Sequence, residues 1–122
     1  MQPLLTDSQL WAAGAACVFM ALDCVSGFIQ AVVNNDVQST KMRQGILHKA
    51  SMAVVIVAVI ALEVTSAHVA GVAIDGVGTV PVCAIVILME LVSIWENACK
   101  ANPDLEGSPL GRLLGNVGEK KE

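Results

Sequence analysis

The chain has 122 residues, of which 55% are hydrophobic and only 15% are charged. Soluble domains carry about 25% charged residues, so this composition excludes an ordinary soluble enzyme and favours a small integral membrane protein. The formal net charge is −4 and no stretch gathers Lys and Arg into a basic stripe, which excludes a nucleic-acid-binding protein.

The first apolar segment covers residues 10–33 and carries a single charge, Asp23. A helix of this length rises about 1.5 Å per residue and exceeds the ~30 Å hydrocarbon core of a bilayer. Asp7 precedes it, but no Lys or Arg does, whereas a secretory leader begins with positive charge. We therefore expect this segment to be retained as a first transmembrane helix that ends at the turn formers of residues 34–36.

Residues 34–50 form a polar connector, and residues 51–74 form a second apolar segment that contains Glu63. Ser39 or Thr40 is expected to cap a short helix that continues into this second span. A strand is excluded by length, since strands rarely exceed about ten residues. The sequence therefore predicts a second transmembrane helix.

Residues 75–79 predict a tight loop, and Pro81 suits the first turn of a third helix. This third span is expected over residues 77–98 and contains Glu90. Residues 99–122 are a polar tail, and its prolines and glycines predict loose order. Its leucines at helical spacing leave open a membrane-surface or partner-binding role for the tail.

The topology follows from the seven basic residues, all of which come after position 40. Those nearest the expected spans are Lys41, Arg43 and Lys49 in the connector and Lys100 at the start of the tail. Basic residues in short loops stay cytoplasmic. We therefore expect an all-α integral membrane protein with three transmembrane helices, its N-terminus out and its C-terminus in. Residues 1–98 form the transmembrane domain, and residues 34–50 and 99–122 are cytoplasmic.

Each expected span carries one carboxylate near its middle, namely Asp23, Glu63 or Glu90. The span boundaries place them roughly 15, 18 and 12 Å deep, in one shared layer near mid-membrane. Intramembrane acids are candidates for function by default, and no Lys or Arg is expected at that depth to pair with them. They are expected either to be protonated and hydrogen-bonded between helices or to face water in an assembled pore. The alternative is that these acids have a structural role only and form hydrogen bonds that hold the helices together.

Four cysteines occur, Cys17, Cys24, Cys83 and Cys99. Their spacing matches no metal or redox motif, so they are expected to be reduced packing residues. The sequence also lacks the short motifs of nucleophilic, phosphate-binding and metal-dependent enzymes. We expect no enzyme activity, no catalytic residues, no cofactor and no metal.

Three blocks of sequence form a recognisable series. The first is D-C-V-S-G, from Asp23 to Ser26 and Gly27, in the first span. The second is Ser39 followed by Gly45 and Lys49, at the start of the second span. The third is E-L-V-S-I-W-E-N in the third span, with Glu90, Ser93, Glu96 and Asn97. Together they resemble the bacteriophage holin family that includes the clostridial toxin-secretion holins.

This resemblance implies a multi-pass protein of the bacterial host's cytoplasmic membrane. Such proteins gather harmlessly in the lipid bilayer and then form homo-oligomers that open lesions. The lesions release an endolysin, the functional partner, or in some relatives a toxin, and the host lyses at a set time. The residues alone leave two alternatives: a small ion or solute channel or transporter subunit that uses Glu63 and Glu90, and an antiholin or membrane adaptor.

Overall fold

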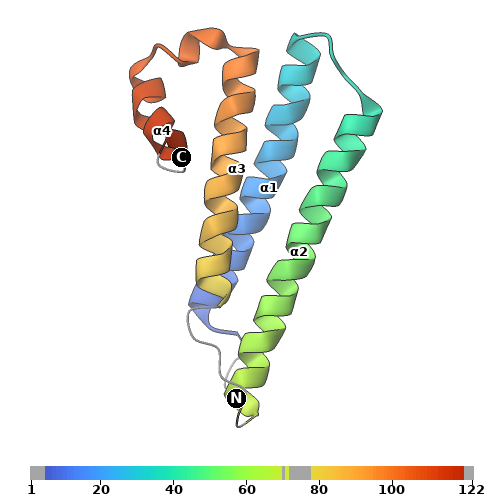
Figure 1. The fold of residues 1–122 in the computed structure, drawn as a ribbon, viewed down its shortest axis with the longest axis vertical. Helices are drawn as coiled ribbons and strands as arrows, with labels where there is room; N and C mark the ends of the chain where they lie inside the picture. Colours follow the sequence, from blue (N-terminus) through green and yellow to red (C-terminus); the bar gives the residue numbers. More distant parts are fainter. Residues whose placement is uncertain (1–4, 70, 72–77, 120–122) are drawn as a thin grey trace.

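The computed structural model describes residues 5–69, 71 and 78–119, with side chains up to residue 114. The described chain is helical (Figure 1), with α1 at Asp7–Val33, α2 at Ser39–His68 and α3 at Thr79–Ala101. A short 3-10 helix, η1 at Pro103–Leu105, and a last helix, α4 at Pro109–Glu119, follow. The three long helices have 27, 30 and 23 residues and are each apolar enough to cross a membrane. The prediction of three membrane helices is therefore confirmed.

The first helix is fixed at both ends by local hydrogen bonds. The Thr6 hydroxyl accepts from the Gln9 amide at 3.2 Å, and the Gln9 side chain accepts from the Thr6 amide at 2.9 Å. This capping box starts α1 three residues before the expected apolar boundary. At the other end Asn35 adopts a left-handed backbone conformation, with φ 52, which asparagine tolerates better than most residues. The turn formers therefore end α1 where the sequence predicted.

The second helix begins inside the predicted connector. It starts at Ser39, with Gln38 as the N-cap, so the expected continuous helix forms but neither Ser39 nor Thr40 caps it. It ends at His68, where the Val69 amide donates to the Thr65 carbonyl at 2.8 Å. Val69 and Gly71 follow the helix as non-helical residues, and the other residues of the predicted span two and most of the predicted loop at 75–79 lie outside the described residues. Within that loop Thr79 is already helical, and Pro81 lies in the first turn of α3 as predicted.

The tail is more ordered than predicted. Pro109 begins α4, and the Ser108 hydroxyl accepts from the Gly111 amide at 3.1 Å. This serine cap satisfies a donor that the helix start leaves free, and proline at the first helical position loses no hydrogen bond. The expectation of a loosely ordered tail is wrong because these two residues start a helix despite the glycines.

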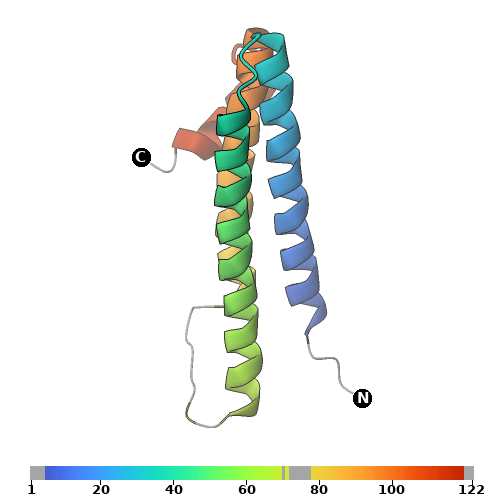
Figure 2. The same ribbon diagram turned by 90° about the vertical axis from the view of Figure 1, so that its right-hand side faces the viewer.

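α1 and α3 run parallel and pack mainly on each other, and α2 runs antiparallel to both. Figures 1 and 2 show the start of α1, the end of α2 and the start of α3 at one end, and the connector with η1 at the other. The buried core consists of Ala16, Met20, Ile56, Cys83 and Val86. Most other large apolar side chains point outward, as expected for a lipid-facing surface.

All four cysteines are free thiols, but they occupy two environments. Cys83 and Cys99 are buried, which agrees with the packing role expected of them. Cys17 and Cys24 are exposed on the outside of α1. The expectation of packing within the chain is wrong for these two, because apolar runs in a membrane helix face lipid as well as protein.

Ala16 tests the close contact between α1 and α3. It is fully buried, whereas its neighbour Cys17 faces outward. Ala16→Leu should lower the free energy of unfolding by about 1–3 kcal/mol, because the added volume has no space. SDS titration of the purified protein, followed by tryptophan fluorescence, measures this. Cys17→Leu is the matched control and should change little, and equal losses in both variants would contradict the packing described.

Candidate functional site

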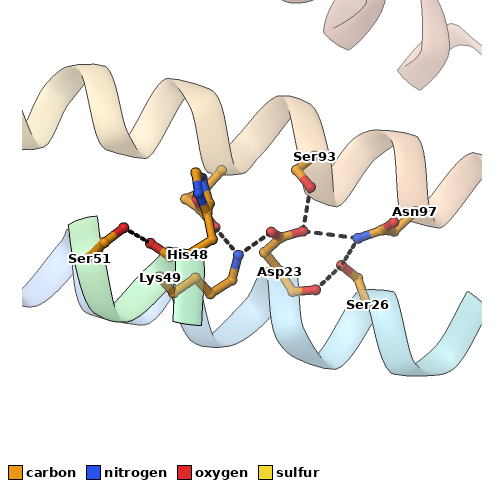
Figure 3. Close-up of polar contacts among 8 residues, drawn as sticks. Asp23, Ser26, His48, Lys49, Ser51, Ser93 and Asn97 are labelled. Atoms are coloured by element: carbon orange, nitrogen blue, oxygen red, sulfur yellow. Dashed lines mark hydrogen bonds and ion pairs between the residues drawn. The ribbon is translucent and has the colours of Figure 1, made fainter. Parts of the chain in front are cut away.

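The centre of the site is an ion cluster of Lys49, Asp23 and Glu90, which joins the three membrane helices. The Lys49 ammonium of α2 lies 2.6 Å from Asp23 Oδ2 of α1 and 3.1 Å from Glu90 Oε2 of α3. Their side chains are only 15%, 11% and 5% exposed, respectively. Figure 3 shows the lysine stem crossing to the Asp23 carboxylate. Each charge in this apolar setting therefore has an opposite charge beside it.

This pairing corrects the expectation that no basic residue reaches the depth of the acids. The sequence places Lys49 in the polar connector, among the residues that predict the topology. In the structure, however, α2 already begins at Ser39. Lys49 follows Ser39 by ten positions, which is about 15 Å along the helix. Its stem of four methylenes carries the ammonium further, since lysine extends along apolar surface to place its charge.

Polar side chains complete the coordination of Asp23. Its Oδ1 accepts from the Ser93 hydroxyl at 2.6 Å and from the Asn97 amide at 2.9 Å. Asn97 also donates to the Ser26 hydroxyl at 3.1 Å, and that hydroxyl donates to the Asp23 carbonyl at 3.0 Å. A buried carboxylate that accepts hydrogen bonds at both of its oxygens fixes the helices that bear its partners.

The helical repeat explains why these residues meet. Glu90, Ser93 and Asn97 are three and four positions apart and share one face of α3. Asp23, Ser26 and Gly27 share the facing side of α1 in the same way. A Cβ at Gly27 would lie 3.6 Å from Asn97 Nδ2, which is an ordinary van der Waals contact, so α1 and α3 lie close together at this position without requiring a glycine. Two of the blocks that carry the sequence resemblance thus form one site.

A cavity of about 250 Å³ lies beside this cluster. Its lining includes Asp23, Lys49 and Ser93, and at the connector it includes the exposed residues Asp36 and Lys41. Gly45 of α2 also lines it, and no atom lies within 4 Å of where its Cβ would be. The glycine therefore keeps space open between the connector end and the buried charges.

Glu63 does not belong to the cluster. It accepts from the Gln9 side chain at 2.8 Å and from the backbone amide of Thr79. It is fourteen residues from Lys49 on α2, about 21 Å along the helix. The expectation of one shared layer of three acids is therefore wrong. Glu63 instead binds at the first turns of α1 and α3, where free amides and the helix dipoles favour a carboxylate.

The remaining candidates lie outside the cluster. Glu96 is exposed on α3, off the face that carries Ser93 and Asn97. Lys41 pairs with Asp36 at 3.6 Å on the surface, and Arg43 is exposed nearby on α2. Lys100 is at the same end, since its carbonyl accepts from the Asn34 side chain at 3.2 Å. Three of the four residues from which the topology was predicted, Lys41, Arg43 and Lys100, therefore lie at the connector end, and the fourth, Lys49, lies in the cluster.

Removing the ammonium of Lys49 tests whether the cluster holds the helices together. Lys49→Met should lower the free energy of unfolding by about 3–5 kcal/mol, because two buried carboxylates lose their counter-charge. SDS unfolding of the purified protein measures the change. Lys41→Met is the control and should cost about 0–1 kcal/mol, because its pair with Asp36 is exposed. Equal effects of the two variants would show that the buried pair does not stabilise the helix bundle.

Comparison with known proteins assigns the chain. A family model described as "Bacteriophage holin family" matches residues 8–106, a stretch that includes α1 from its second residue, α2, α3 and η1. No curated protein and no solved structure matches. Because the family model covers most of the chain, the chain belongs to the bacteriophage holin family and is a multi-pass protein of the cytoplasmic membrane.

Proposed function

We propose that this holin-family protein forms homo-oligomers in the host's cytoplasmic membrane and opens lesions that release an endolysin, or a toxin, at a set time. The observation that carries the proposal is the buried cluster of Lys49, Asp23 and Glu90. It is built from residues of the holin-like sequence blocks, and it lies inside a membrane domain whose outer surface is apolar. Such a molecule is compatible with lipid until its charges are released.

The orientation in the membrane is part of the proposal. Lys41, Arg43 and Lys100 lie at the connector end, and positive residues in short loops remain in the cytoplasm. We therefore assign the connector and the tail to the cytoplasmic side and the N-terminus to the outside. The cavity beside the cluster then faces the cytoplasm.

The cluster supplies a physical reason for delayed action. Separating buried charges in lipid is expensive, so a dispersed chain keeps Lys49 paired. In an assembly with a water-filled interior the same charges are hydrated while they separate, so opening the cluster costs less. Assembly and hydration of the cluster therefore favour one another.

Expression in bacteria tests the proposed function and separates it from the alternatives. The chain should stop growth abruptly after a delay, and a co-expressed endolysin without its own export signal should then lyse the cells. A channel or transporter subunit would change ion or solute uptake without passing a folded enzyme. An antiholin or adaptor would do neither alone, and continued growth with endolysin retained inside would contradict the proposal.

Neutralising one acid should change the time of lysis. Asp23→Asn and Glu90→Gln keep the size of the side chain but weaken the attraction to Lys49, so release of the cluster becomes easier and growth should stop earlier. Culture turbidity after induction measures the delay, and immunoblots of membranes confirm equal insertion. Asp36→Asn is the control, because Asp36 is 55% exposed and its carboxylate contacts the surface residues Lys41 and Gln38 rather than the cluster. Unchanged timing in both cluster variants would remove the cluster from the mechanism.

A further inference from the structure

α2 is the least embedded of the three membrane helices. Ile56 is its single buried residue among those described, whereas α1 and α3 each bury several. Met52 and Ile60, one turn to either side, are only partly buried against the same core. In a membrane, the apolar face of such a helix gains little free energy by contacting another helix instead of lipid, since lipid tails are equally apolar. Packing alone therefore does not fix α2 in place.

Two polar contacts fix it instead, one towards each end. We call them the connector-end clamp, which is Lys49 with Asp23 and Glu90, and the loop-end clamp, which is Glu63 with Gln9 and Thr79. In both clamps α2 supplies one side chain and the α1–α3 pair supplies the partners. The α1–α3 pair has its own contacts through Ser93 and Asn97 with Asp23. Opening the clamps would free α2 and leave that pair closed.

Released clamp groups need new partners, because unpaired charges are costly in the membrane. A second copy opened in the same way offers the same acids and the same helix starts. We infer that on assembly α2 leaves its own α1–α3 pair and docks on the α1–α3 pair of a neighbouring copy, where its Lys49 binds that copy's Asp23 and Glu90. The inference rests on the proposed oligomer and names the surface that forms it.

The connector permits this exchange. Residues 34–38 separate α1 from α2, and five extended residues span about 16 Å. Packed helices lie about 8–10 Å apart, so α2 can reach a neighbour placed beside its own α1–α3 pair. Exchange in one direction is a head-to-tail contact, which closes into rings or grows as open chains. Assemblies of no fixed size would follow from one repeated contact.

Cross-linking between two differently tagged chains tests the exchange. One chain carries Ile56→Cys as its sole cysteine, and the other keeps only Cys83. Both positions are buried in one core cluster, so a short bifunctional thiol reagent links them only where α2 lies on α3. The inference predicts cross-linked products between the two tags in membranes after growth stops and about tenfold less before it. A second pair, Met20→Cys on one chain and Ile56→Cys on the other, repeats the test against α1.

The α1–α3 pair provides the control. Ala16→Cys together with Cys83 probes two fully buried positions of that pair, and their cross-link should stay within one chain at all times. Absence of 56–83 cross-links between the two tags in lysing cells would overturn the exchange while the holin function stands. Exchange of the 16–83 pair between chains would equally overturn it, because the whole bundle would then have opened. Cells that never lyse would count against the proposed function and, with it, this inference.

Discussion

The arrangement of the membrane domain depends on the pairing of one ammonium with two carboxylates in an apolar environment. Lys49 lies 2.6 Å from Asp23 and 3.1 Å from Glu90, and each of these residues comes from a different helix. Without such partners any one of the three charges would have to reach water or lose its charge. The relative heights of α1, α2 and α3 at this level are therefore set by electrostatics more than by apolar packing.

The three membrane helices follow directly from the sequence, because lipid offers the backbone no hydrogen bonds and an apolar segment must satisfy its own. The ends of the helices follow less directly, since hydropathy marks where apolar residues stop and not where helical hydrogen bonding stops. Lys49 shows the consequence, because it looks like a connector residue although α2 has already run ten positions before it. The order of the tail was missed for a related reason, since one serine cap at Ser108 outweighs the glycines.

The site was partly predictable. The spacing of Glu90, Ser93 and Asn97 places them on one helix face, and Asp23 was identified as an intramembrane acid, so both sides of the α1–α3 contact were visible. Lys49, the partner from α2, could not be predicted in this way. The depths of the side chains in the membrane were counted from approximate span ends, which assumes that the three helices start and end at the same level. The same assumption placed Glu63 with the other acids, although α2 extends beyond the start of α3 (Figure 2) and brings Glu63 to the helix starts.

The distribution of polarity sets the problem that any lesion must solve. In the single chain the charges lie inside and the apolar side chains lie outside. The wall of a water-filled opening requires the reverse on the face that contacts water, where polar side chains must be exposed. Rigid chains packed side by side would line such an opening with Val, Ile and Leu and would leave it dry. The proposed lesion therefore requires a change within the chain, and α2 is the helix whose removal uncovers Asp23 and Glu90 at the lowest cost in buried apolar contact. In the proposed exchange the polar clamps that hold α2 on its own α1–α3 pair hold it on the neighbouring copy instead, so one set of residues determines both states.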